Sequence, residues 1–132
     1  MASPDARHLT LSLVRGRYAV VRLAPAADVP AWVAGGELLS ITRTQEELSI
    51  VCAQVTVPAG VTIQGGFYCL KVQGPLDFVL TGILASLALP LAQAEISIFA
   101  ISTYDTDYLL LPEGKLECAV TVLTQAGHTI LR

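Results

Sequence analysis

Charged and aromatic residues are scarce in this sequence. Charged residues fill 14% of its 132 positions, aromatic residues fill 6%, and the net charge is −3. Nucleic-acid binding requires a basic surface, and recognition of single-stranded RNA adds aromatic side chains that stack on bases, so both functions are disfavoured. The sequence also lacks a run of Lys and Arg that could hold an anionic membrane surface.

Long hydrophobic runs and paired cysteines are missing as well. Residues 78–91, the most apolar stretch, are too few to span a bilayer, and we interpret them as a core helix. The first residues lack the apolar segment of a signal peptide. Cys52, Cys69 and Cys118 are far apart and form no C-x-x-C pair, which favours buried free thiols in a cytoplasmic protein.

The sequence contains none of the common catalytic and cofactor motifs. It has no G-x-S-x-G, no H-E-x-x-H and no P-loop, and no spacing of Ser, His and Asp nominates a catalytic triad. His8 and His128 have no second His or Cys at the spacing of metal ligands. We therefore expect neither enzyme activity, nor a cofactor, nor a metal site.

Hydrophobic residues are abundant, at 53% of the chain. This length and composition suit one ordinary domain, or two very small ones that share a core. The apolar fraction exceeds what a lone small domain usually needs, so we expect a buried self-association surface.

Hydrophobic periodicity predicts an internal structural repeat. From residue 67 onward the order is strand, helix, strand, strand, helix, strand, which is the split βαβ pattern of the ferredoxin-like fold. The first half shows a reduced version of this order, with a short helix capped by Asp28, one helical turn over residues 44–48 and a linker over residues 54–66. We therefore predict an α+β protein of two ferredoxin-like units, residues 8–62, with reduced helices, and residues 63–132, packed as one compact tandem.

The candidate site lies in a predicted hairpin over residues 96–111. Its connection, residues 102–107, reads Ser-Thr-Tyr-Asp-Thr-Asp and contains no Gly, although tight hairpin turns more often use Asn-Gly or Asp-Gly. Hydroxyl and carboxylate groups are therefore concentrated at one end of an apolar hairpin, where they can bind a polar ligand.

Two segments carry a family resemblance. Residues 99–110 (F-A-I-S-T-Y-D-T-D-Y-L-L) and 74–84 (G-P-L-D-F-V-L-T-G-I-L) resemble small bacterial proteins with tandem ACT domains, and residues 37–51 resemble their first-domain signature. The same pattern occurs in the CASTOR arginine sensors and in the regulatory end of aspartate kinases. ACT domains are regulatory modules that pair side by side and bind amino acids at the interface. The sensors have four such domains and this chain has room for two, so the resemblance implies a homodimer through sheet pairing.

The resemblance also implies a set of ligand-binding residues. They come from the loop before the first helix, a step in the following strand and the hairpin turn, namely Gly74, Leu76, Asp77, Ser97, Ile98, Thr103, Tyr104, Thr106 and Asp107. A helix N-terminus suits the ligand's carboxylate, and an acid suits its ammonium, for which we expect Asp107 first and Asp105 second.

Structural roles for the same residues remain open. Asp77 can simply cap the helix, and Asp107 can satisfy backbone N–H groups. The threonines can be turn formers, Ser97 an ordinary strand residue, and Tyr104 a packing residue at the dimer interface.

Three functions fit this sequence. The first is a cytoplasmic, non-catalytic regulatory protein that binds an amino acid or a related small metabolite between ACT domains. The second is a ligand-free interaction module that uses the same interface only for assembly. The third is an accessory regulatory subunit of an enzyme of amino-acid metabolism.

Overall fold

The computed structural model describes residues 8–74, 76 and 81–132, which form two compact units. The first unit is Arg15–Phe67, and the second unit joins residues 8–14 to the chain from Tyr68 to Arg132. The units therefore differ from the contiguous segments 8–62 and 63–132, because the first strand of the chain packs with the second unit. Strand β5 (Ile63–Val72) gives its first residues to one unit and its last residues to the other.

The first unit is an antiparallel sheet in the order β3-β4-β2-β5. Two short 3-10 helices, η1 and η2, stand where a ferredoxin-like unit has α-helices, which confirms the prediction of reduced helices. The core contains Val21, Val33, Leu48, Ile50 and Cys52. The elements are β2 (Tyr18–Leu23), η1 (Ala31–Val33), β3 (Ser40–Arg43), β4 (Leu48–Ala53), η2 (Gln54–Thr56) and the start of β5.

Three local predictions for the first unit were wrong. The N-cap of η1 is Pro30, without a side-chain cap, rather than Asp28. Residues 44–47 form a hairpin turn between β3 and β4 rather than a helical turn, because the Thr44 N–H donates to the Glu47 carbonyl across the turn. The predicted linker over residues 54–66 contains η2 and the first residues of β5.

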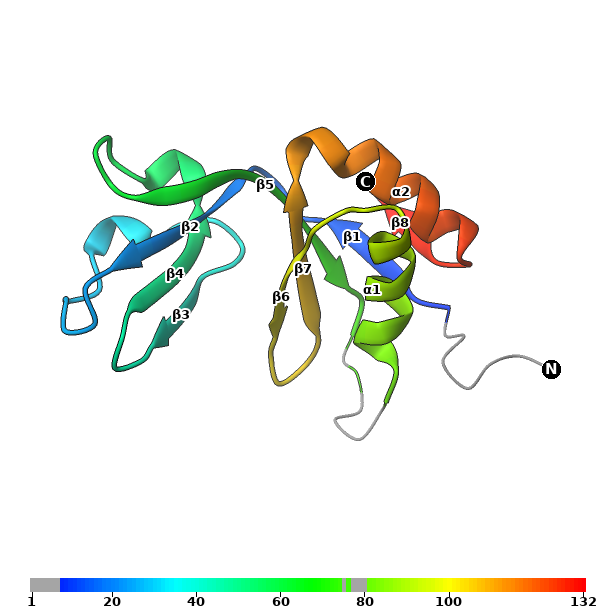
Figure 1. The fold of residues 1–132 in the computed structure, drawn as a ribbon, viewed down its shortest axis with the longest axis horizontal. Coiled ribbons are helices and arrows are strands. Elements are labelled where there is room, and N and C mark those ends of the chain that lie inside the picture. The colour runs from blue at the N-terminus through cyan, green and yellow to red at the C-terminus, as the bar shows by residue number, and fades with distance from the viewer. Residues whose placement is uncertain (1–7, 75, 77–80) are drawn as a thin grey trace. The chain divides into compact units, whose positions relative to one another are not determined.

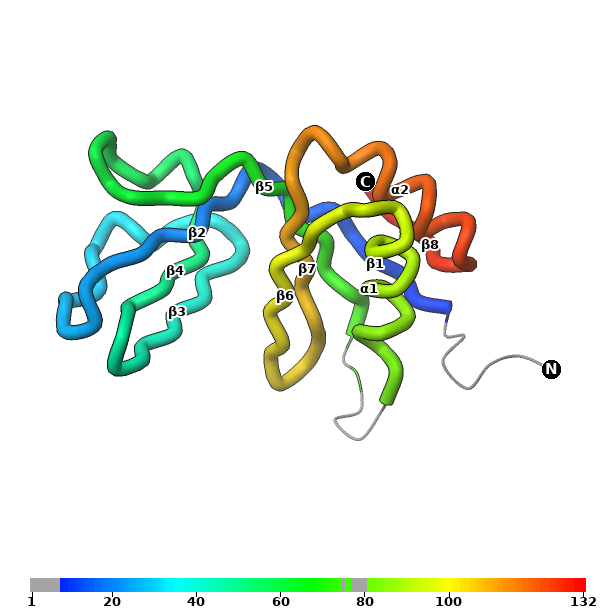
Figure 2. The backbone as a smooth tube through the Cα atoms, in the orientation of Figure 1, coloured from blue at the N-terminus to red at the C-terminus, as the bar shows by residue number. Residues whose placement is uncertain are grey.

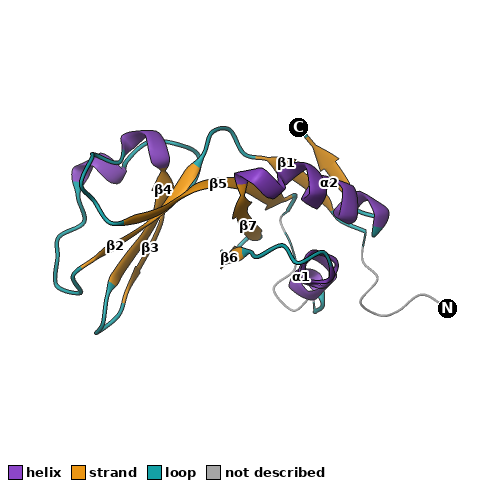
Figure 3. Ribbon diagram, turned by 45° about the horizontal axis from the view of Figure 1, so that its top comes forward, coloured by secondary structure: helices purple, strands orange, loops and turns teal. Residues whose placement is uncertain are grey.

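The second unit follows the predicted strand and helix order (Figures 1 and 3). An additional strand, β1, lies between β5 and β8, antiparallel to the former and parallel to the latter. Strand β7 pairs with β5 and β6. The elements are β1 (Thr10–Leu13), the end of β5, α1 (Ile83–Gln93), β6 (Phe99–Ser102), β7 (Asp107–Pro112), η3 (Glu113–Lys115), α2 (Leu116–Gln125) and β8 (Thr129–Leu131).

Both helices pack on one face of this sheet. Alternate residues of the strands point toward the helices, as period-2 side-chain geometry requires. The resulting core joins Leu87 and Leu91 of α1 to Ala119 and Leu123 of α2 over a floor of strand residues, which include Leu11, Leu70, Val72, Leu109 and Leu111. Burial of this cluster fixes which residues of β5 and β7 point toward the helices and which point to the opposite face.

A buried histidine connects α1 to the strands. Pro90 has no N–H group and therefore cannot donate to the carbonyl of Ser86, four residues earlier in α1. His128, which is 3% exposed, fills this place, because its Nε2 lies 3.1 Å from the Ser86 oxygen. Its Nδ1 accepts a hydrogen bond of 3.1 Å from the backbone N–H of Leu9, just before β1. This pair of bonds requires the neutral imidazole with its proton on Nε2.

The three cysteines are free thiols, but their environments differ. Cys52 and Cys69 are buried as predicted, whereas Cys118 is exposed, so the prediction was wrong for that residue. Burial raises the pKa of the Cys52 thiol. In the described part of the chain, no helix has the length and hydropathy that a bilayer span requires.

Candidate ligand-binding site

The hairpin between β6 and β7 ends in a turn held by its own threonines. The Thr103 N–H donates to the Thr106 carbonyl at 2.8 Å, and the Thr103 hydroxyl bonds both the carbonyl and the N–H of Thr106, at 3.1 and 3.2 Å. The Thr106 side chain is 5% exposed and donates to the carbonyl of Val72 in β5 at 2.6 Å. The two threonines therefore fix the turn and anchor it to the neighbouring strand.

The loop after β5 lies against this turn. The Leu76 N–H donates to the Asp105 carbonyl at 2.7 Å. A Cβ atom on Gly74 would lie 3.0 Å from the same carbonyl oxygen and 3.3 Å from the Thr106 Cβ, so this close approach favours glycine. The structure thus brings Gly74 and Leu76, two residues of the predicted ligand-binding set, to the turn. Asp77, the third predicted loop residue, lies outside the described residues.

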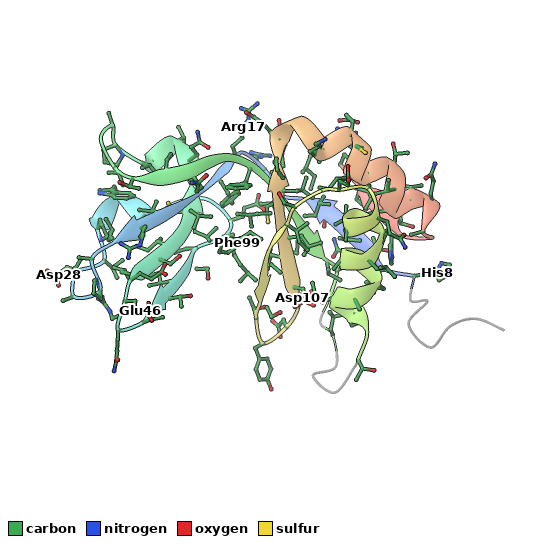
Figure 4. The ribbon with its side chains drawn as sticks, viewed as in Figure 1. His8, Arg17, Asp28, Glu46, Phe99 and Asp107 are labelled. Carbon is green, nitrogen blue, oxygen red and sulfur yellow. The ribbon has the colours of Figure 1, made fainter. Side chains whose placement is uncertain are left out.

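The two acids of the turn have different surroundings. Asp107 is directly opposite Ser102 in the β6–β7 register, and its Oδ1 accepts a 2.5 Å hydrogen bond from the Ser102 hydroxyl. Alternation along β7 places Asp107 on the face of Leu109, toward the helices. Figure 4 shows Asp107 near the turn end of the hairpin. Asp105 is exposed, and among the described residues its carboxylate has no hydrogen-bond or ion-pair partner.

A pocket of about 320 Å³ opens beside the turn, within the second unit. This volume falls in the range of small-molecule sites, roughly 300 to 1,000 Å³. The lining includes Gly74, Thr103 and Thr106 from the predicted set, and Asp105, the second choice for the ammonium partner. The remaining lining residues, Lys71, Gln73 and Tyr108, were not predicted from the sequence.

Lys71 and Tyr108 lie on the sheet face opposite the helices. Lys71 stands between the core residues Leu70 and Val72 in β5, so its side chain points away from that core. Its Nζ lies 6.0 Å from the centroid of the Tyr108 ring, a cation–π arrangement across β5 and β7. A period-2 pattern was the available sequence signal, because Lys71 alternates with the apolar residues Leu70 and Val72, and Tyr108 alternates with Leu109.

The other predicted site residues lie elsewhere. Ser97 and Ile98 precede β6; Ser97 is exposed, and Ile98 packs against the core of the second unit. The side chain of Tyr104 is 85% exposed at the tip of the turn. None of these three residues lines the pocket described above. Among the described residues, no group of three or more His, Cys, Asp or Glu side chains could hold a metal ion.

The strand and helix order of these ferredoxin-like units is that of ACT domains. A family model for the ACT domain matches residues 62–125, and a second model, described as an N-terminal domain, matches residues 16–60. The crystal structure of protein Atu0741 from Agobacterium tumefaciens is 42% identical, with a TM-score of 0.90 over 95% of this chain and 93% of that one. The chain therefore belongs to the ACT-domain family, as a small tandem protein.

Two more distant relatives have regulatory descriptions. The rat cytosolic arginine sensor for mTORC1 subunit 1 is 41% identical over 49 residues, which are 37% of this chain but only 15% of the sensor. The regulatory subunit of aspartate kinase from Thermus flavus has a TM-score of 0.59 over 91% of this chain and 97% of that one. Its identity of 12% shows a shared fold alone.

Proposed function

We propose that this protein is a non-catalytic regulatory protein that binds an amino acid or a related small metabolite beside the β6–β7 turn. The observation that carries the proposal is the pocket at this turn, which Asp105 lines with a carboxylate that has no partner among the described residues. An ammonium group is the natural partner for such a carboxylate, since it supplies both charge and hydrogen-bond donors.

The position of the ammonium distinguishes Asp105 from Asp107. Sequence reasoning favoured Asp107, but its carboxylate already accepts the Ser102 hydroxyl and lies on the helix-covered face. Asp105 lines the pocket and has no such competitor, so it is now the first choice. Asp107 remains the alternative, with the Ser102 hydroxyl as a neighbour that could orient it toward a ligand.

A homodimer through sheet pairing is part of the same proposal. Strands β3 and β6 are edge strands of their units. Edge strands have unpaired backbone N–H and C=O groups that can pair with a strand of another chain. Their apolar side chains are partly open to solvent: Leu39, just before β3, is 43% exposed, Ile41 44% and Phe99 38%. In such a dimer Ser97 and Ile98 could approach the ligand from the partner chain. The same edges also support the second candidate function, assembly without a ligand.

A screen of the melting temperature in the presence of each common amino acid tests the proposal, at neutral pH and moderate salt. Ligand that binds only the folded state stabilises it by RT ln(1 + [L]/Kd), about 2.7 kcal/mol at 100 times Kd. We expect at least one amino acid to raise the melting temperature, and Asp105→Asn to abolish the shift. A shift that persists in Asp105→Asn but disappears in Asp107→Asn returns the ammonium to Asp107. If no amino acid shifts the melting temperature while the protein is dimeric, the assembly function stands instead.

A further inference from the structure

The pocket beside the turn contains opposite charges that do not neutralise each other. Lys71 and Asp105 both line it, yet they form no salt bridge with each other. Within the described part of the chain, neither side chain has any other ion-pair partner. Two unpaired charges of opposite sign on the wall of one small pocket leave a position between them for a ligand that carries both charges.

The surroundings of Lys71 restrict its side chain and place its ammonium group near Tyr108, another residue that lines the pocket. The stem of Lys71 emerges from β5 between two core residues, which restricts its direction. The Tyr108 ring lies 6.0 Å from the Nζ and attracts the cation without neutralising it. Gln73, another lining residue, donates its side-chain amide to the hydroxyl of Ser12 in β1, so the pocket wall beyond β5 is also tied to the sheet.

We propose that Lys71 binds the carboxylate of the ligand, so that the site selects α-amino acids with a free carboxylate. This inference rests on the proposed function and completes it, because Asp105 takes the ammonium at the turn while Lys71 takes the carboxylate on the sheet face opposite the helices. The sequence instead predicted a helix N-terminus for the carboxylate. Helix α1 begins at Ile83, after Gly82, and its first residues do not line the pocket.

Charge complementarity makes the site sensitive to small chemical changes in the ligand. An amino-acid amide keeps the ammonium but loses the negative charge that faces Lys71. The corresponding 2-oxo acid keeps the carboxylate but loses the ammonium that faces Asp105. Hydrogen bonds to charged groups contribute about 1.5 to 3 kcal/mol, so each loss should weaken binding by about 10- to 100-fold.

The test compares Lys71→Met with the wild type by calorimetric titration. The probes are the amino acid with the largest thermal shift, its amide and its 2-oxo acid. Methionine keeps the apolar stem and removes the charge, and Lys71→Gln is a second variant with a neutral polar end. Lys115→Met is the matched control, because Lys115 lies in η3 and does not line the pocket. The melting temperature of each unliganded variant verifies folding.

We expect both Lys71 variants to bind the amino acid about 10- to 100-fold more weakly and to lose the preference for acid over amide, while Lys115→Met behaves as wild type. Wild-type affinity with an intact preference in both variants would overturn the role of Lys71 and leave the proposed function standing. Lys71-dependent binding of the 2-oxo acid without any binding of amino acids supports Lys71 and refutes the amino-acid function. No binding of any probe to the wild type refutes both.

Discussion

The β3–β4 hairpin of the first unit and the β6–β7 hairpin of the second unit have the same backbone design (Figure 2). The strands before the two turns, β3 and β6, have 4 residues each, and the strands after them, β4 and β7, have 6 residues each. The turns themselves are residues 44–47 and 103–106. In each turn the first residue is a threonine whose N–H donates to the carbonyl of the fourth residue, at 2.9 Å for Thr44 and 2.8 Å for Thr103. Its hydroxyl accepts from the N–H of that fourth residue, at 3.1 and 3.2 Å. The turn is therefore the clearest remnant of the internal repeat.

The side chains that follow these threonines differ. In the first unit the residue after the turn is Leu48, which is fully buried in the core. Its counterpart in the second unit is Asp107, which bonds the Ser102 hydroxyl. The third turn residues, Glu46 and Asp105, are both exposed acids, and Asp105 lines a pocket together with a lysine. The comparison teaches that the backbone turn alone makes no site, and that binding chemistry depends on what surrounds the acid.

The largest difference between the hairpins should appear in stability after truncation of the residue that follows each turn. Leu48→Ala leaves a cavity in the first core and should lower the free energy of unfolding by about 2 to 5 kcal/mol. Asp107→Ala should cost no more than about 1.5 kcal/mol, because one side-chain hydrogen bond is lost. Urea denaturation measures both. Equal costs would show that the two positions have not diverged as described.

A second expected effect concerns α1, one of the two α-helices of the second unit, which have only short 3-10 counterparts in the first. His128→Leu leaves the Ser86 carbonyl and the Leu9 N–H without their side-chain partner and should cost about 1 to 3 kcal/mol for each unsatisfied group. In a Pro90→Ala background the new N–H of residue 90 can donate to Ser86, so His128→Leu should cost less there. A double-mutant cycle in urea measures the coupling, and additive costs would contradict this link between Pro90 and His128.

A smaller loss of stability is expected where the loop after β5 packs closely against the turn over residues 103–106. Gly74→Ala places a Cβ 3.0 Å from the Asp105 carbonyl and 3.2 Å from the Leu76 N–H nitrogen, so the loop must shift. Overpacking of this kind typically costs about 1 to 3 kcal/mol, and the shift should also weaken ligand binding. Gly114→Ala is the control, because a Cβ there meets no atom within 4 Å. Equal melting temperatures and affinities for the two variants would show that the loop yields freely.

The smallest effect should come from an exposed ion pair of the second unit. Arg132 donates to both carboxylate oxygens of Glu117, at 2.9 and 2.6 Å, and these bonds lower the pKa of Glu117. Because the pKa is lower in the folded state than in the unfolded state, the ion pair stabilises the fold at pH values above the unfolded-state pKa. This stabilisation is lost as the pH falls through the folded-state pKa. Glu117→Gln should therefore lower the melting temperature slightly at neutral pH and leave it unchanged in acid. Because both side chains are exposed, high salt should remove the difference.

Much of the fold follows from local sequence patterns. Periodicity predicted the strand and helix order of the second unit, because these signals come from neighbouring residues. The place of β1 between β5 and β8 could not be predicted, since no local pattern specifies pairing between strands so far apart in the sequence. The same limit affects His128, whose role depends on Pro90 in another element.

The candidate site shows the same division between local and distant information. The turn threonines and Gly74 were predicted, because the family motif contains them, and the structure brings them together. Lys71 and Tyr108 belong to different strands and are part of no recognised motif. That they line one pocket follows only from the pairing of β5 with β7. The sequence ranked Asp107 before Asp105, but it did not show their surroundings, which depend on β-strand register and on the shape of the turn.

The most direct test of the account is a calorimetric titration of two matched variants with the amino acid found in the thermal-shift screen. Asp105→Asn and Glu46→Gln each remove one exposed carboxylate from the third position of equivalent turns. We predict that Asp105→Asn weakens binding by about 10- to 100-fold and that Glu46→Gln retains the wild-type affinity. Loss of binding in Glu46→Gln with full binding in Asp105→Asn would contradict the assignment of the ligand to the second unit.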